Sequence, residues 1–174
     1  LQRGVLVVPV ATLLERLAPR HYLDGHSLVL ALGDRLDLDF TRRRLNLAGY
    51  QCVSQVIAHG EYAVRGSLLD VFPMGSREPF RIDLFDAEVE SIRVFDPDSQ
   101  RSKEKVEAIR LLPAREFPLG EEAVAGFRQR YRALFEGNPQ NSLVYREVSN
   151  GGVPGGLEYY LPLFFEETAT LFDY

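Results

Sequence analysis

PFRIDLFDAEVESIRVFD, residues 79–96, is the stretch that decides the fold of this chain. Residues 79–85 and 88–96 each have the composition of a β-strand, and Asp86 with Ala87 lies between them in a segment typical of a tight turn. The stretch therefore predicts a β-hairpin. Loops of two residues and of three residues both fit it, so the register of the hairpin stays open at this point.

The two sides of the first strand of this hairpin differ in chemistry. Alternation places Phe80, Ile82 and Leu84 on one side, which we predict to face a core. The other side carries Arg81, Asp83 and Phe85. If that side faces water, an exposed aromatic ring lies beside an arginine, which is a composition that binding hot spots favour. Alternatively, Phe85 covers a second small core and Arg81 pairs with Asp83 or a neighbouring carboxylate; periodicity favours neither.

The preceding segment EYAVRGSLLDVFP, residues 61–73, is predicted to form strand as well, with Arg65 as a charge in an otherwise apolar run. Leu68 and Leu69 are adjacent, so the alternation is ambiguous just past Gly66. A β-bulge at Gly66 is one way to turn Arg65 outward.

Working outward, the sequence predicts an α/β (α+β) chain in three parts. Residues 27–113 form a mainly antiparallel sheet domain with one or two helices, in which Asp37 or Asp39 caps the helix that Gly49 ends. Residues 1–26 read as the remnant of an upstream α/β domain, with a buried strand at 4–10 and a helix that Pro19 closes. Residues 114–174 form a helical segment, with helices near 121–137 and 142–149.

Composition narrows the classes of function. The chain has 174 residues and a formal net charge of -5, which argues against broad, charge-driven binding of nucleic acid. No apolar run approaches the length of a membrane-spanning helix, so we expect no membrane association. Cys52 is the one cysteine, which fits a reducing, cytoplasmic compartment, and we expect it to be a small buried side chain.

No motif for catalysis, metal binding or phosphate binding stands out. No serine lies in a nucleophile-elbow pattern, and no Cys-x-x-Cys or His-Glu-x-x-His spacing is present. The acidic pairs at residues 37–39 and 96–98 are typical of helix caps and turns. The glycine-rich segment 150–156 lacks the lysine of a P-loop. We therefore expect no cofactor, no metal and no enzymatic activity in this chain.

Residues 48–102 closely resemble the N-terminal region of the bacterial transcription-repair coupling factors (the Mfd family). They resemble, more loosely, the matching region of the excision-repair helicase UvrB. The shared positions are Arg65-Gly66, Asp70-Val71, Pro73, Arg81-Ile82, Phe85, Asp86, Glu88, Ile92 and Asp96-Pro97. The likeness extends over essentially the whole chain, because QRGVLVVPV and GGLEYYLPLFF are also similar to family segments. It identifies the chain as a fragment of a longer protein.

The resemblance implies a protein-binding module that recruits UvrA for nucleotide excision repair at a stalled RNA polymerase. Carried over by position, the UvrA-contacting residues are Arg65, Arg81 and Phe85, with Asp83 a weaker candidate. UvrB has a further arginine where this chain has Ala63, so that contact is absent or replaced.

The resemblance further implies that a C-terminal domain of the full-length protein covers the same face. RNA polymerase, DNA and the ATP-driven motor would engage through parts outside this chain. The alternative function is a non-catalytic, DNA-contacting module of a UvrB-like repair helicase.

Overall fold

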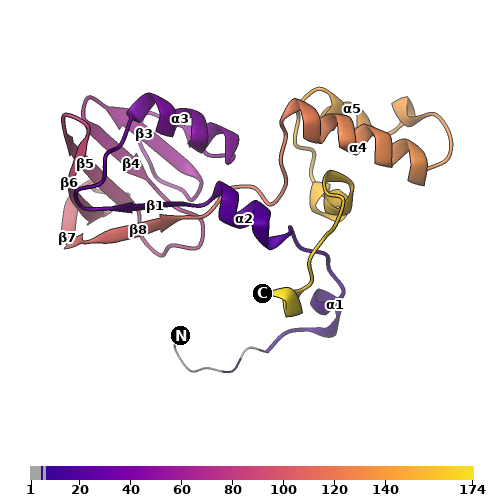
Figure 1. The fold of residues 1–174 in the computed structure, drawn as a ribbon, viewed down its shortest axis with the longest axis horizontal. Helices are drawn as coiled ribbons and strands as arrows, with labels where there is room; N and C mark the ends of the chain where they lie inside the picture. Colours follow the sequence, from indigo (N-terminus) through magenta and orange to yellow (C-terminus); the bar gives the residue numbers. More distant parts are fainter. Residues whose placement is uncertain (1–4, 6) are drawn as a thin grey trace. The chain divides into compact units, whose positions relative to one another are not determined.

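The computed structural model describes residue 5 and residues 7–174, and it divides the chain into two compact units. Leu23–Arg115 forms one, which we name the sheet unit. The described residues through Tyr22, together with Glu116–Tyr174, form the other, which we name the helical unit. Figure 1 shows the strands gathered in the first and the longest C-terminal helices in the second.

The sheet unit contains a six-stranded sheet with the order β2-β3-β4-β5-β6-β7 and a separate pair, β1-β8, within the described residues. The strands are β1 (Leu28–Ala31), β2 (Gln51–Cys52), β3 (Glu61–Arg65), β4 (Leu68–Val71), β5 (Phe80–Phe85), β6 (Glu88–Phe95), β7 (Ser102–Val106) and β8 (Ala108–Leu111). All neighbours pair antiparallel except β2 and β3, which are parallel. The mixed, mainly antiparallel fold class predicted from the sequence is confirmed.

The β5–β6 hairpin forms as predicted, and the structure settles its register. Phe85 pairs with Glu88, so the loop is the two-residue Asp86–Ala87, and Asp86 adopts a positive φ of 56°. The register shifts between Asp83 and Leu84, where β6 skips Glu90. Because β5 itself stays regular, its alternation holds to the tip of the hairpin.

One face of the sheet packs into the main core, beneath helix α3 (Leu38–Leu47) (Figure 1). Ile82 and Leu84 are buried there and Phe80 packs against them, which confirms the predicted core side of β5. Tyr62 is fully buried, and its hydroxyl donates to Asn46 Oδ1 of α3 at 2.9 Å, tying the helix to the sheet.

Helix α3 begins and ends at the predicted residues. Asp37 is the N-cap, since its Oδ1 accepts from Phe40 N at 2.8 Å. Gly49 follows the C-terminal Ala48 with a φ of +91° and lies against the side chain of Arg115, so a Cβ there would collide with it. Both signals are local, which is why the sequence predicts them.

Replacing Asp37 by alanine is expected to lower the free energy of unfolding by about 1 kcal/mol, because the first turn of α3 loses its side-chain acceptor. Asp39→Ala is the matched control: it removes the same charge from the first turn but no hydrogen bond, and is expected to cost about half as much or less. Urea unfolding followed by the amide signals of α3 measures both. Equal losses would mean that charge rather than the cap stabilises this end.

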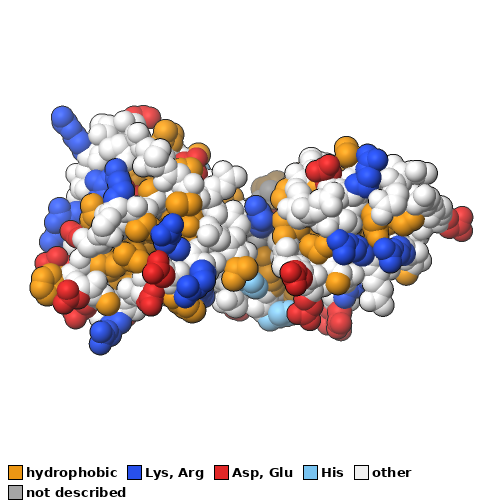
Figure 2. Space-filling model, turned by 90° about the horizontal axis from the view of Figure 1, so that it is seen from above, with side chains coloured by type: hydrophobic (Ala, Val, Ile, Leu, Met, Phe, Trp, Pro, Cys, Tyr) orange, Lys and Arg blue, Asp and Glu red, His pale blue; other side chains and the backbone are white. Residues whose placement is uncertain are grey.

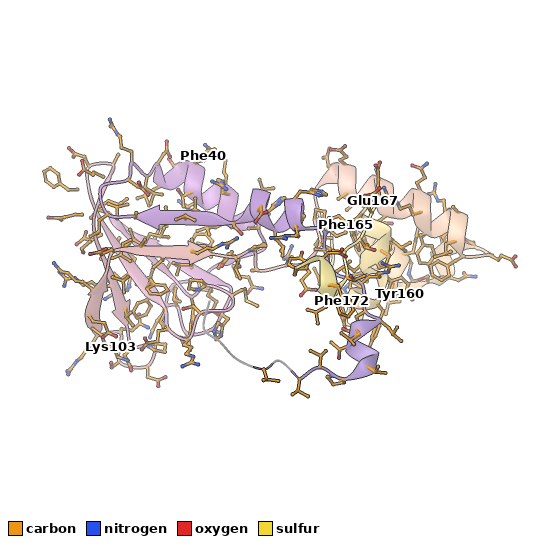
Figure 3. The ribbon with its side chains drawn as sticks, turned by 60° about the horizontal axis from the view of Figure 1, so that its bottom comes forward. Phe40, Lys103, Tyr160, Phe165, Glu167 and Phe172 are labelled. Carbon is orange, nitrogen blue, oxygen red and sulfur yellow. The ribbon has the colours of Figure 1, made fainter. Side chains whose placement is uncertain are left out.

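The helical unit contains α4 (Glu121–Leu134) and α5 (Leu143–Ser149), which confirms both helices predicted in this segment. The 3-10 helices in this part of the chain are η1 (Pro139–Asn141), η2 (Leu157–Phe164) and η3 (Leu171–Asp173). Their core is aromatic: Phe127 and Tyr131 of α4 meet Tyr145 of α5 and Phe164 of η2. Tyr160 and Phe165, labelled in Figure 3, pack against this core from the η2 segment.

The strand predicted at residues 4–10 and the helix end predicted at Pro19 are wrong where the structure describes them. Residues 7–9 form no strand, Val5 and Val7 are exposed, and a one-turn helix, α1 (Val10–Leu13), follows; residues 4 and 6 lie outside the described residues. Pro19 does not close a helix but immediately precedes another, α2 (Arg20–His26). A β-branched run forms a buried strand only when neighbouring strands pair with it, and no described strand does so.

Candidate functional site

The candidate site lies on the side of the six-stranded sheet that faces away from the main core, which we name the outer face. Two rows of side chains cross β3, β4 and β5 there in register. One row is Arg65, Leu68 and Asp83, and the next is Ala63, Asp70 and Arg81. Phe85 follows two residues after Asp83 on the same side of β5. All four predicted site residues therefore share this face.

Asp70 organises the outer face, and we did not single it out from the sequence as a site residue. Its carboxylate is almost completely buried, with 1% of the side chain exposed, and two arginines hold it. Arg81 donates from Nε to Oδ1 at 2.7 Å and from Nη2 to Oδ2 at 2.8 Å, and Arg65 Nη2 also donates to Oδ2. The signal in the sequence was a single acid inside the apolar run SLLDVF, five residues from the nearest other charge, that of Arg65.

The guanidinium group of Arg81 is largely engaged in contacts within the sheet unit. Its Nη1 donates to the backbone carbonyl of Gln100 at 3.1 Å, and its guanidinium lies 4.9 Å from the ring centre of Phe95. The hydrogen bonds to Asp70 raise the pKa of Arg81, and they outweigh the lowering caused by burial. With 18% of its side chain exposed, Arg81 offers little surface to a partner and serves mainly to fix Asp70.

Arg65 and Phe85 are the accessible members of the set. Arg65 keeps 48% of its side chain exposed while it is anchored to Asp70, and Phe85 is 71% exposed. No bulge forms at Gly66, contrary to the suggestion from the sequence. Gly66 and Ser67 are instead the two-residue turn of the β3–β4 hairpin, with a φ of +61° at Gly66, where a type II′ turn places glycine.

The sequence left two alternatives for the outer face: an exposed Phe85 beside an arginine, or a Phe85 that covers a second core while Arg81 forms an ion pair. Each alternative is partly right. A second small core does exist, formed by Val56, Ala63, Phe72 and Phe95. Phe85 is not part of it and is exposed, whereas Arg81 does pair with a carboxylate, that of Asp70 and not of Asp83. Asp83 is half-buried, and its side chain makes no hydrogen bond or ion pair with any residue that the structure describes. Ala63 is buried, so it offers no side chain to a partner.

The other candidate residues have structural roles. Asp96 accepts from the backbone N and the Oγ of Ser99, both at 2.9 Å, and these hydrogen bonds lower the pKa of Asp96 in its turn. Cys52 is exposed, contrary to expectation, because β2 is a two-residue strand at the sheet edge. Among residues 5 and 7–174, no cluster of His, Cys, Asp and Glu could hold a metal, and no helix has the length and hydropathy to cross a membrane.

Comparison with known proteins identifies relatives along the whole chain. The family described as "UvrB interaction domain" matches residues 28–117. A transcription-repair-coupling factor of Escherichia coli (strain K12) is 53% identical and covers 100% of this chain. Those of Haemophilus influenzae and Bacillus subtilis (strain 168) are 48% and 30% identical and cover 99% and 98% of it. The chain spans only 15% to 16% of the length of these relatives. The matched region is a non-catalytic interaction domain.

Proposed function

We propose that this chain, which belongs to the transcription-repair-coupling factor family and carries the family's UvrB interaction domain, binds UvrA through the outer face of its sheet unit. One observation carries the proposal: Arg65 of β3 and Phe85 of β5 are exposed on the same face of the sheet, and a buried carboxylate anchors Arg65. Exposed arginine and aromatic side chains on a rigid sheet are what interface hot spots are made of.

The arrangement of Arg65 supports binding because its orientation is fixed in advance. The contact with Asp70 restricts the rotamers of a long side chain, so less conformational entropy is lost when a partner binds. Two guanidinium groups share one carboxylate, which leaves a net positive charge at this point of the face. An acidic group of UvrA would accept a charge-assisted hydrogen bond from the exposed part of Arg65.

Phe85 and Asp83 complete the proposed contact. Phe85 stands next to the hairpin tip with most of its ring in water, so burying it against an apolar surface of UvrA is favourable. Asp83, which lies in the row of Arg65 and two residues before Phe85, would accept a hydrogen bond at the edge of the contact. Arg81 contributes through Asp70, which it holds in place.

The same proposal extends to the role of the outer face in the full-length protein. In a full-length, cytoplasmic bacterial factor, the outer face would recruit UvrA to a stalled RNA polymerase, and a C-terminal domain would cover it beforehand. RNA polymerase and DNA would be bound by parts outside this chain. We also propose residues 27–113 as the UvrA-binding domain, with residues 1–26 and 114–174 belonging to the adjoining domains.

Titration of UvrA against single alanine variants tests the proposal. Phe85→Ala is expected to weaken binding by about 2 kcal/mol, roughly thirtyfold, because a hot-spot ring is lost. Arg65→Ala should weaken binding by about 1.5 kcal/mol and reduce its salt dependence. Phe40→Ala and Arg43→Ala are the matched controls, since both remove exposed side chains of α3, which covers the opposite face of the sheet.

Unchanged affinity in the Arg65, Arg81 and Phe85 variants would overturn the assignment of the site. Binding of duplex DNA by the chain, falling steeply as salt rises, would instead favour the DNA-contacting alternative.

A further inference from the structure

A pocket of about 330 Å³ lies in the helical unit between α4, α5 and η1. Three arginines line it: Arg128 and Arg132 from α4, and Arg146 from α5. No Asp or Glu lies among the described residues that form its wall. Figure 2 shows several arginine side chains, in blue, on the visible face of the helical unit, with acidic side chains, in red, toward its edges.

The charge of the three arginines is not balanced within the protein. The guanidinium groups of Arg132 and Arg146 make no ion pair and donate no hydrogen bond to any residue that the structure describes. Arg128 binds only neutral groups: Nε donates to Ser149 Oγ at 3.1 Å and Nη2 to the Ser149 carbonyl at 2.6 Å. In a chain with a net charge of -5, three guanidinium groups around one pocket create a local positive potential that attracts anions.

Tyr145 gives a second, independent observation at the same pocket. Its side chain lines the pocket, only 1% of the residue is exposed, and its hydroxyl has no hydrogen-bond partner among the described residues. A buried hydroxyl without a partner costs free energy, and most such groups in folded proteins are satisfied. This hydroxyl lies beneath the pocket surface, so a ligand oxygen would satisfy it once a side chain of the wall moves aside.

We propose that this pocket binds a phosphate group. The donors come from different elements: the arginines of α4 and α5, the hydroxyl of Tyr145 and the amide of Gln140 in η1. Donors that surround a ligand suit a tetrahedral oxyanion, whose oxygens point in several directions, better than a planar carboxylate with two oxygens. Arginine binds phosphate oxygens bidentately. Ser149 occupies the Nε and Nη2 edge of Arg128 and so orients its guanidinium, which leaves Nη1 to reach a ligand.

Titration of the chain with inorganic phosphate at constant ionic strength tests the proposal. Saturable shifts of the arginine Nε–H signals and of the Tyr145 ring signals are expected. Arg132→Gln and Arg146→Gln should each weaken binding about tenfold or more, since each removes a charge-assisted hydrogen bond. Arg77→Gln, which removes an exposed arginine of the sheet unit, is the matched control and should leave binding unchanged.

Tyr145→Phe separates ligand binding from folding. It removes only a hydroxyl that has no partner among the described residues, so thermal stability should be equal or higher, while phosphate affinity falls about threefold or more. A short single-stranded oligonucleotide then identifies the source of the phosphate. Competition with inorganic phosphate indicates a phosphodiester backbone, and lack of competition indicates a free phosphate or monoester.

Three results would each overturn the proposal. The first is the absence of saturation, or equal shifts with chloride. The second is acetate binding as tightly as phosphate, which would indicate an acidic peptide. The third is unchanged phosphate affinity in the Arg132, Arg146 and Tyr145 variants.

Discussion

Arg81→Ala is expected to lower the free energy of unfolding of the sheet unit by about 3 kcal/mol, because it leaves a buried carboxylate without its main partner. Asp70 is 1% exposed and receives two hydrogen bonds from Arg81, at 2.7 and 2.8 Å. The variant also removes the packing of the guanidinium on Phe95. Urea unfolding followed by the amide signals of β4 and β5 measures the loss.

Arg65→Ala is the matched comparison for this prediction. Arg65 makes one contact with Asp70 and is half exposed, so its removal leaves the Arg81 pair intact and should cost about 1 kcal/mol or less. The double variant Asp70→Leu/Arg81→Leu should regain most of the stability lost in Arg81→Ala, because apolar groups can replace a buried ion pair at little cost. A double variant as unstable as Arg81→Ala would contradict the role given to the buried charge.

This comparison also separates folding from UvrA binding. Arg65→Ala should weaken binding while leaving the sheet nearly as stable as before. Arg81→Ala should affect both, since loss of Arg81 disturbs Asp70 and, through it, the position of Arg65.

Phe127→Ala is expected to lower the free energy of unfolding of the helical unit by about 4 kcal/mol, since it leaves a cavity in a tightly packed core. Phe127 is fully buried, and its ring centre lies 4.9 Å from that of Phe164, 5.7 Å from Tyr131 and 6.4 Å from Tyr145. These ring contacts add to the loss of buried area. The amide signals of α4 and α5 during urea unfolding give the value.

Phe172→Ala is the control for Phe127. It removes an aromatic ring of the same size from the same unit, but Phe172 is mostly exposed, so the cost should stay below about 0.5 kcal/mol. Figure 3 labels this residue near the C-terminal end of the chain. A loss below about 1 kcal/mol in Phe127→Ala would show that the core relaxes around the missing ring.

The sequence by itself determined the elements whose signals are local. The β5–β6 hairpin follows from two strand-like runs on either side of Asp86 and Ala87, and α3 follows from the cap at Asp37 and the stop at Gly49. The common face of Arg81, Asp83 and Phe85 follows from the alternation of residues 80–85. The relationship to transcription-repair-coupling factors, expected from the spacing of residues 65–97, agrees with relatives that match the whole chain.

Predictions from the sequence failed where secondary structure depends on pairing with other strands. The run at residues 4–10 is β-branched and apolar, yet its described residues are not strand, because no described strand pairs with them. Conversely, we did not predict β7 (Ser102–Val106), whose charged sequence SKEKV lacks an apolar side. At the edge of the sheet, pairing with β6 on one side suffices to hold it.

Only the tertiary structure decided what Arg65 and Arg81 contact. Alternation assigns each side chain to a face of its own strand, but the register between β3, β4 and β5 brings both arginines to Asp70. The tertiary structure also gives the two arginines different roles. Arg81 is enclosed by Gln100 and Phe95 from distant parts of the chain, while Arg65 stays half exposed. Periodicity describes one strand at a time, whereas burial and ion pairing depend on how several strands pack together.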